Sequence, residues 1–429
     1  MKRRGWVALV FLAPALLVLG ALVVWPALKT GYDSLFDRLG QEFVGLDNYQ
    51  EMFRFDRMRT AIFNSFIWVV AFPLVVTAVG LVLAVLSDKV SWKRAFRLII
   101  FIPAAIAILS SGIIWRVMYE ADPGRGVLNA LANIPISIVS PAGDLAGAAP
   151  STDTLVVADD GSVAASVDVG SDGAVVRLGL LRLTEAELPE GATEAVTPTT
   201  GGSGTVVGVV WRDTRPGDNE KGVVEPGELG VPGVSVVLVD GSGNQVAETI
   251  TDSDGTFALE GIPSGSYQAA IAGSEFREPW GGITWLGKDL ITYSAMFAGL
   301  WVWGGFALLI IAAGLASLPR DTLEAARVDG ANEWQVFRHV TVPQLSPVLI
   351  VVFIALTINA LKMFDLIVGI APGSVQDDAN VIALEMWRTA FTGIGNRGLG
   401  SAIAVFLFIL ILPILIFNIR RFTISEHEG

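Results

Sequence analysis

The chain has 429 residues, of which 52% are hydrophobic and only 17% are charged, and its mean hydropathy is +0.58. About a quarter of the residues of a soluble globular protein are charged, so this composition excludes a disordered chain and argues against a soluble one. The absence of cysteine excludes a disulfide framework and thiolate metal sites, and two histidines leave little for an imidazole site. The composition predicts a membrane protein.

The charge is distributed unevenly along the chain. Residues 135–280 hold 22 acidic and 6 basic side chains, a balance of −16, whereas the whole chain carries −13. An acidic, soluble segment therefore interrupts a slightly basic membrane protein. Neither part has the basic face of a nucleic-acid-binding protein, so no nucleic-acid partner is expected.

Six runs of the chain are apolar and contain no Asp, Glu, Lys or Arg. Crossing a bilayer core about 30 Å thick takes roughly 20 apolar residues of helix. The first run follows a basic N-terminus, but it is too long for the apolar core of a signal peptide and no A-x-A site follows it. The predicted spans are Trp6–Leu28, Phe63–Ser87, Leu98–Trp115, Leu290–Leu318, Ser346–Leu361 and Leu399–Ile419.

Lysine and arginine in the segments between spans predict the orientation. With the N-terminus inside, the inner segments (2–4, 89–97, 320–342 and 420–429) hold 12 basic residues in about 45, and the two short outer segments hold 7 in about 60. We therefore expect a multi-pass protein of a bacterial plasma membrane, with both termini cytoplasmic and the acidic insert extracellular or periplasmic.

The insert is expected to be rich in β structure. Residues 135–204 combine Ala/Gly/Ser/Thr-rich linkers with a candidate small β unit, and residues 205–272 contain short β-forming runs separated by Asp-Gly, Pro-Gly and Ser-Gly turns. That spacing predicts an antiparallel sandwich. The predicted fold class is thus an all-α polytopic membrane protein of six transmembrane helices with an inserted extracellular all-β sandwich domain. The predicted strands are Thr205–Trp211, Val234–Val239, Gln245–Ile250, Thr256–Leu259 and Ser266–Ile271.

The inner segment between spans four and five, residues 317–345, predicts two short helices. Asp321 or Thr322 can cap the first, Gly330 lies where the chain must turn, and the second is expected to end before Pro343. A protruding helical hairpin can dock in a groove of a partner through its apolar side, namely Leu323, Ala326, Val336 and Phe337. The alternative is a loop packed on the ends of its own helices.

The spacing of this segment resembles the EAA loop of ABC importer permeases. Glu324-Ala325-Ala326, three residues, Gly330, nine residues and then Val340-x-Val342-Pro343 follow the pattern EAA-x3-G-x9-I-x-L-P with two aliphatic departures. The resemblance implies that this loop forms the coupling helix for an ATP-binding subunit. The residues that it would assign to ATPase coupling are Glu324, Ala325, Ala326, Asp329, Gly330 and Pro343.

Three further segments, "FVGLDNYQEMF", "IIFIPAAIAILSSGIIWRVMY" and "FDLIVGIAPG", resemble sugar permeases of the maltose and α-glucoside importers. On that resemblance, residues 1–134 hold spans one to three and residues 280–429 hold spans four to six with the coupling loop. The implied partners are a second permease subunit, an ABC ATPase dimer, an extracellular solute-binding protein, a sugar substrate and membrane lipid.

The chain itself is not expected to be an enzyme or to bind ATP. The segment "GITWLGKD" fits G-x4-G-K, but Asp289 replaces the Ser or Thr that would hold magnesium, and an aspartate there would repel phosphate. No nucleophile–base pair can be argued from the sequence. ATP is expected on the partner ATPase, and no cofactor is expected in the permease part.

Candidates for the translocation pathway lie near the end of span five. Lys362 and Asp365 are ionisable residues near a membrane span, and such residues are functional candidates. A sugar site needs hydrogen-bonding groups and aromatic faces, which Asn359, Phe364 and Trp303 can offer. The alternative is an ion pair between Lys362 and Asp365, three residues apart on one helix, with ordinary packing around it.

The stretch of residues 205–272 resembles the B-type repeat of bacterial surface proteins, of the SdrD-B or Cna-B, prealbumin-like kind. The match rests on Gly208-x-x-Trp211-x-Asp213, on Gly230-x-x-Gly233-Val234 and on the turn from Thr251 to Gly255. Some relatives bind calcium after the first strand, and Asp213, Asp218 and Glu228 are hard oxygen donors suited to it. Solvated acidic turns are the alternative.

Two other classes of protein explain the sequence less well than an importer permease does. A membrane-anchored adhesion or scaffold protein would use the sandwich, but it leaves six spans and the EAA loop unexplained. A secondary transporter commonly has repeated halves and buried coupling charges, and the sequence has neither. The leading hypothesis is a permease subunit that forms half of the pathway for a sugar such as an α-glucoside or oligosaccharide.

Overall fold

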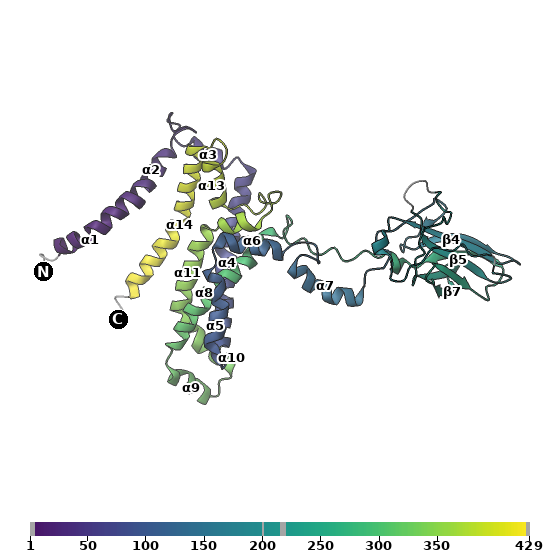
Figure 1. Cartoon of the computed structure of the whole chain (residues 1–429). Helices are drawn as coiled ribbons and strands as arrows, with labels where there is room; N and C mark the ends of the chain where they lie inside the picture. The colour runs from purple at the N-terminus through teal and green to yellow at the C-terminus, as the bar shows by residue number, and fades with distance from the viewer. Residues whose placement is uncertain (1–4, 200, 215–219, 426–429) are drawn as a thin grey trace. The chain divides into compact units, whose positions relative to one another are not determined.

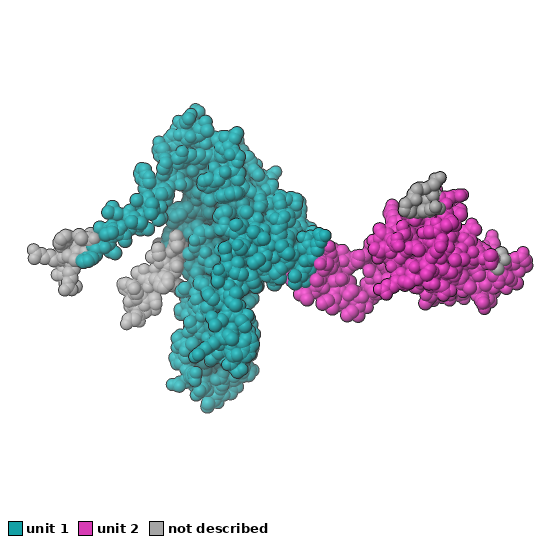
Figure 2. Space-filling model, in the orientation of Figure 1, with its two compact units in different colours: residues 1–121, 125–127, 284–429 teal, residues 122–124, 128–283 magenta. Residues whose placement is uncertain are grey.

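The computed structural model describes residues 5–199, 201–214 and 220–425, and the chain forms two compact units. The helical unit comprises Met1–Ala121, Arg125–Val127 and Thr284–Gly429, and the β unit comprises Asp122–Gly124 and Leu128–Ile283 (Figure 2). The basic residues 2–4 used to predict the orientation lie outside the described residues, as does the predicted calcium ligand Asp218.

The N-terminal part of the helical unit begins with one long apolar helix. It consists of α1 (Gly5–Leu19), the π-helical turn η1 (Gly20–Val24) and α2 (Trp25–Asp33). Its side chains from Phe11 onward are mostly exposed, as expected for a helix that faces lipid or a partner. An ion pair of 2.7 Å between Arg397 Nη2 and Asp33 Oδ2 fastens the end of α2 to the start of α14 (Arg397–Ser425).

The second and third predicted spans differ in shape. A short helix α3 (Asp47–Met52) precedes α4 (Asp56–Lys89), which is one unbroken helix through the predicted second span. The third span is broken: α5 (Lys93–Phe101) and the 3-10 turn η2 (Ile102–Ala105) meet α6 (Ile108–Met118) at an angle of 101°. Pro103 lies within this break, where it cannot donate a backbone hydrogen bond to the preceding turn.

The C-terminal half of the helical unit begins with α8 (Ile291–Ala316). It continues through α9 (Arg320–Val328), α10 (Glu333–Val336), the π-helical turn η5 (Phe337–Thr341) and α11 (Val342–Leu361). Two shorter helices, α12 (Asp365–Ile370) and α13 (Ile382–Phe391), then lead to α14.

Small residues let the two halves of the helical unit approach closely. A Cβ added at Gly112 of α6 would lie 2.7 Å from the carbonyl oxygen of Leu366 and 3.0 Å from Cα of Gly369, both on α12. A Cβ added at Gly80 of α4 would lie 2.7 Å from Cβ of Ala307 on α8. The halves, separated in sequence by the β unit, therefore form one packed body.

The number of apolar helices is smaller than the six spans predicted. Among the described residues, four helical segments are long and apolar enough to cross a membrane, or five if the bent pair counts as one. The shortfall lies at the third and sixth spans, because the third is broken and the described apolar part of α14 ends at Pro413. The coarser prediction, a helical protein with several apolar spans and a β region, is confirmed.

The β unit contains two sheets. One has the strand order β1-β4-β5-β8 and the other β2-β3-β9-β6-β7. The helix α7 (Val127–Val139) precedes them, and the 3-10 turns η3 (Glu185–Glu187) and η4 (Gly273–Phe276) complete the unit. The strands are β1 (Ala149–Pro150), β2 (Val156–Val157), β3 (Val163–Val169), β4 (Ala174–Leu181), β5 (Val206–Arg212), β6 (Ser235–Asp240), β7 (Gln245–Ile250), β8 (Thr256–Leu259) and β9 (Gly265–Ile271).

All five strands expected between residues 205 and 272 are present within one residue of their expected bounds. Two details differ. The segment 135–204 does not form a separate small unit, because β3 pairs with β9 and β4 pairs with β5. The β4–β5 pair is parallel, so the sandwich is not purely antiparallel. Leu178, Val210, Leu238 and Ile271, from both sheets, share one buried core.

Candidate functional sites

The coupling-loop segment, residues 317–345, lies at one end of the helical unit. Figure 1 shows α9 and α10 at this end and α3 and α13 at the opposite end. Asn332 caps α10, because its side chain accepts a hydrogen bond from the backbone N–H of Gln335 and the Gln335 side chain accepts one from Asn332 N. The expected cap of α9 is absent: Pro319 occupies the N-cap position without a side-chain hydrogen bond, and Asp321 lies in the first turn.

Gly330 forms the turn between α9 and α10, as predicted. Its φ of +87° lies in the left-handed region, which a residue with a Cβ adopts only with strain. A Cβ added there would meet no heavy atom within 4 Å, so the constraint is conformational rather than steric. The turn angle between the two helices therefore depends on glycine.

The second helix of the loop does not end before Pro343, contrary to the prediction. Helix α10 continues through η5 into α11, and the backbone N–H of Val342 donates to the carbonyl of Phe337, five residues earlier. This π-helical register lets the helix run on past Pro343, which sits in the first turn of α11 and has no backbone N–H to donate.

The apolar side expected to face a partner turns toward the chain's own helices instead. Val336 is buried, and Leu323 and Phe337 are half-buried. Together with residues of α4 and α8 they line a hollow of about 450 Å³. The apolar side chains that project from the loop are Val328, 86% exposed, and Trp334, 64% exposed.

Most residues of the EAA pattern lie on the exposed surface of the loop. Glu324, Ala325 and Asp329 are exposed, Ala326 is half-buried and Pro343 is exposed. An ion pair of 2.8 Å from Arg327 Nε to Glu333 Oε1 joins α9 to α10 across the turn. The Arg327 guanidinium, through this hydrogen bond and its charge, lowers the pKa of the Glu333 carboxyl below its usual value. Both groups therefore stay charged at neutral pH.

The translocation candidates near α11 are not brought together as one ion pair. Helix α11 ends at Leu361 and α12 begins at Asp365, so Lys362 and Asp365 lie on either side of a break. Both side chains are exposed, and the described ion pairs include none between them. The interpretation of a neutralising pair on one helix is therefore wrong.

The other candidates have local partners. Asn359 Nδ2 donates to the carbonyl of Ala355, one turn earlier on its own helix. The ring of Trp303 meets Phe306 edge-on at 5.6 Å between centroids, and its Nε1 is buried without a hydrogen-bond partner among the described residues. Phe364 stacks instead on Trp387 of α13, with centroids 6.3 Å apart and planes inclined by 25°.

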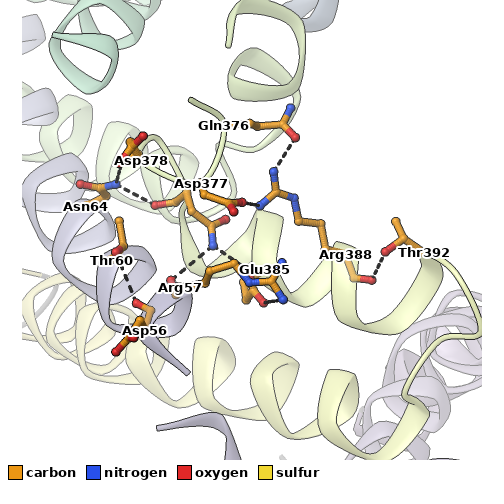
Figure 3. Close-up of polar contacts among 11 residues, drawn as sticks. Asp56, Arg57, Thr60, Asn64, Gln376, Asp377, Asp378, Glu385, Arg388 and Thr392 are labelled. Carbon is orange, nitrogen blue, oxygen red and sulfur yellow. Dashed lines mark hydrogen bonds and ion pairs between the residues drawn. The ribbon is translucent and has the colours of Figure 1, made fainter. Parts of the chain in front are cut away.

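A polar pocket that the sequence did not indicate lies beside that aromatic stack. It has a volume of about 380 Å³ and includes Trp387, so we call it the Trp387 pocket. Its charged side chains are Arg57, Asp377, Glu385 and Arg388, which Figure 3 shows converging from α4, α13 and the loop between α12 and α13. The full lining is Arg57, Gln376, Asp377, Glu385, Trp387, Arg388, Thr389 and Thr392.

The side chains of the Trp387 pocket are fixed by one another. Arg388 donates to the Asp377 carboxylate at 2.6 Å and also to Gln376, and Arg57 Nη2 lies 3.8 Å from Glu385 Oε1. Glu385 is nearly buried, and its other oxygen accepts a hydrogen bond of 2.7 Å from Asn380 Nδ2. The only sequence signal for this pocket is a glutamate and an arginine three residues apart in an otherwise apolar helix.

Asn64 has a structural role behind the pocket. It is buried on α4, and its amide donates to the backbone carbonyls of Asp378 and Asn380 at 2.7 and 2.9 Å (Figure 3). Ser65 accepts a hydrogen bond from the backbone N–H of Ile382. These bonds hold the loop before α13 against α4.

Two of the three predicted calcium ligands lie close together in the β unit. Asp213 and Glu228 are both fully buried. Asp213 Oδ2 accepts from Gly222 N at 2.6 Å, Glu228 Oε2 accepts from Glu225 N at 2.9 Å, and Glu228 Oε1 has no hydrogen-bond partner among the described residues. Burial raises the pKa of Glu228 above its usual value, and the charge of Asp213 adds to the rise. No group of three or more metal-ligating side chains occurs within the described ranges, so calcium binding stays a prediction.

Residues 236–423 match the family described as binding-protein-dependent transport system inner membrane component. The chain is 27% identical over 420 residues to the alpha-glucoside transport system permease protein AglF of Rhizobium meliloti, covering 98% of this chain and 82% of the relative. Over nearly its whole length the chain is thus similar to permease proteins of sugar importers and related uptake systems. The resemblance to sugar permeases is thus confirmed, whereas the resemblance of residues 205–272 to a B-type repeat stays a prediction.

Two further relatives are also permease proteins of uptake or transport systems. The osmoprotective compounds uptake permease protein GgtC of a Synechocystis species is 27% identical over 420 residues, covering 97% of this chain and 99% of the relative. The trehalose/maltose transport system permease protein MalF of Thermococcus litoralis is 35% identical over 142 residues, 32% of this chain and 46% of the relative. The likeness to the full-length relatives extends through the inserted unit.

A solved structure shares the fold of this permease. The match is to a bacterial ABC transporter involved in the import of the acidic polysaccharide alginate, with a TM-score of 0.56 and 14% sequence identity. It covers 98% of this chain and 96% of that one. A second structure of a bacterial alginate ABC transporter, in complex with an alginate pentasaccharide-bound periplasmic protein, matches with a TM-score of 0.55. At this identity the likeness concerns the fold alone.

Proposed function

We propose that this permease forms half of the membrane pathway of an importer for an α-glucoside or oligosaccharide, and that the coupling-loop segment docks on the partner ATPase. The family and the named relatives support sugar import by a complex with a second permease, an ATPase dimer and a solute-binding protein. None of the relatives reported above is an adhesion or scaffold protein, so that alternative gains no support.

The observation that carries the coupling role is the geometry of the loop. A glycine at φ +87° sets the angle between two short helices, and the Arg327–Glu333 ion pair holds that angle. Glu324, Ala325 and Asp329 and the apolar side chains Val328 and Trp334 are exposed on this hairpin. Exposed apolar side chains on a rigid helical hairpin suit insertion in a groove of a partner.

The proposed orientation has the coupling loop and both termini in the cytoplasm and the β unit outside. The excess of basic residues in the inner segments supports it. The ATP supply is cytoplasmic, so the loop that docks on an ATPase must face that side. The end of the helical unit that carries α13 and the Trp387 pocket then faces outward.

Co-purification of the ATPase from the native host tests the coupling role. We expect Gly330→Val to reduce the recovered ATPase about tenfold or more, because a β-branched residue at positive φ costs about 1–3 kcal/mol and re-aims both helices. Gly373→Val is the matched control, since Gly373 has no positive φ and a Cβ there would meet nothing within 4 Å. Equal ATPase recovery with Gly330→Val and wild type would refute docking through this loop.

A further inference from the structure

The Trp387 pocket combines balanced charges with an aromatic wall. Its two arginines and two carboxylates carry equal and opposite charge, and each arginine lies within 4 Å of one carboxylate. An anion would meet two carboxylates there and a cation two guanidinium groups. The electrostatics of the pocket therefore favour a ligand that is polar but uncharged.

A sugar hydroxyl suits this arrangement because it donates and accepts hydrogen bonds at once. It can accept from Arg388 or Arg57, which have only donors, and donate to Asp377 or Glu385, which have only acceptors when ionised. Arg57 and Asp377 are more than half exposed, so their outer polar atoms remain accessible to a ligand. Hydrogen bonds to charged groups are stronger than those between neutral groups.

The aromatic wall supplies the apolar contact that the C–H face of a sugar ring needs. Trp387 is 38% exposed and stacks on Phe364, which fixes the plane of the indole. A partly exposed aromatic ring that is held by a stacked neighbour offers apolar contact at low entropic cost. The pocket volume of about 380 Å³ lies in the range of small-molecule sites.

The buried network behind the pocket keeps these groups in place before any ligand arrives. Asn380 is fully buried and donates to the nearly buried Glu385, and Asn64 on α4 anchors the same loop. Because these hydrogen bonds are already formed without a ligand, binding does not have to order the loop. Pre-organisation of this kind is typical of a binding site rather than of a solvated loop.

We propose that the Trp387 pocket binds one ring of a neutral saccharide and excludes uronates, at the end of the helical unit opposite the coupling loop. This inference rests on the proposed function and narrows it to a neutral substrate. It also gives Phe364, a predicted pathway residue, the role of a positioning residue that supports Trp387. The likeness to an alginate importer thus concerns the fold, and the charge balance of the pocket points to a different cargo.

Saturation-transfer NMR on the full chain in nanodiscs tests the proposal, with maltose and trehalose as neutral probes and an alginate trisaccharide as the acidic probe. We expect binding of at least one neutral probe and none of the acidic one. Trp387→Ala should lower the affinity for the neutral probe about tenfold or more. That loss is expected when stacking and the hydrogen bonds aligned by it are removed together. Trp387→Phe should restore most of the affinity, because it keeps an aromatic face.

Trp92→Ala is the matched control, because Trp92 is also exposed and pairs with a phenylalanine, Phe96, but lies at the start of α5 and does not line the pocket. It should leave sugar binding unchanged. Asp377→Asn removes an exposed carboxylate, and the excess positive charge should let the acidic probe bind. Binding of all three probes equally, or of none, or unchanged affinity with Trp387→Ala, would overturn the proposal. A Trp387→Ala effect on docking of the solute-binding protein alone would also overturn it in favour of a protein contact.

The measurement is independent of the coupling test. The sugar probes are read on the permease with or without its partners, so equal ATPase recovery with Gly330→Val and wild type would refute the proposed coupling and leave the pocket result intact. Conversely, a complex that assembles normally around a permease without sugar binding would refute only the pocket.

Discussion

The helical unit and the β unit place their apolar side chains in opposite ways. In the β unit, side chains such as Leu178 and Leu238 are fully buried between two sheets. In the helical unit, large apolar side chains such as Phe11 and Phe66 point outward, at 82% and 65% exposure. Water would disfavour that second surface strongly, whereas hydrocarbon would not. One chain thus contains a unit whose surface suits lipid and a unit whose apolar side chains are buried away from solvent.

The largest expected difference between the two units is their accessibility from outside the cell. The natural chain lacks cysteine, so a single introduced thiol reports one position. A membrane-impermeant maleimide added to intact cells or spheroplasts should label Ser242→Cys in the β unit and should not label Val328→Cys in the coupling loop. Permeabilised cells should label both, which controls for reactivity. Labelling of Val328→Cys from outside would invert the proposed orientation.

A smaller but still large effect is expected when a buried side chain of the β unit is truncated. Trp211 is fully buried, and Trp→Ala changes at such sites cost about 3–5 kcal/mol. Limited proteolysis of the full chain should therefore cleave the β unit of Trp211→Ala sooner than that of wild type, while ATPase co-purification persists.

Phe66→Ala is the counterpart in the helical unit, where the lost side chain faces outward. It should change neither the proteolysis pattern nor co-purification. If Trp211→Ala also abolished ATPase recovery, the two units would not be independent in stability.

The smallest expected effect concerns the buried acids of the β unit. Because the folded-state pKa of Glu228 is raised, folding binds its proton more tightly. Its contribution to stability is therefore fully present below the ordinary pKa of a glutamate, 4.5, and is lost as pH rises through the raised value. In the presence of a chelator, thermal unfolding of the β unit should thus begin at lower temperature at pH 7 than at pH 5.

Glu228→Gln should remove most of that pH dependence. If the predicted calcium site exists, calcium at pH 7 should raise the unfolding temperature of wild type and not that of Glu228→Gln. Glu194→Gln, which changes a partly exposed acid of the same unit, is the control. An identical calcium response in all three proteins would exclude a site at Asp213 and Glu228.

Local patterns in the sequence predicted the parts of the fold that depend on near neighbours. The alternation in Gln245–Ile250 and Thr256–Leu259 gave strands with those same bounds, and Gly330 was placed at its turn. The parallel β4–β5 pair could not be foreseen, because pairing over long distances leaves no periodicity in either strand. The break near Pro103 was hidden within an apolar run that satisfies every criterion of length and composition for a straight span.

The candidate sites were predictable to different degrees. The residues assigned to ATPase coupling follow a spaced pattern, so the sequence alone proposes them, and their role stays a prediction. The Trp387 pocket depends on Arg57 meeting Glu385, more than three hundred residues away, and no local motif records that meeting. For Lys362 and Asp365 the sequence suggested a pair that the structure does not contain. A spacing of three residues predicts a pair only if one helix continues through both residues.

The close contact of Gly80 on α4 with Ala307 on α8 also bears on the order in which the chain can fold during synthesis. These helices belong to one packed body, yet the β unit, about 160 residues, must be translated between them. About 200 residues separate the end of α4 at Lys89 from the start of α8 at Ile291, so at roughly 5–20 residues per second α8 is synthesised about 10–40 s after α4. During that interval the N-terminal helices have no C-terminal half to cover them, and the β unit can complete its own core first. The N-terminal helices are thus exposed to lipid or to a membrane chaperone for far longer than in a chain of consecutive spans.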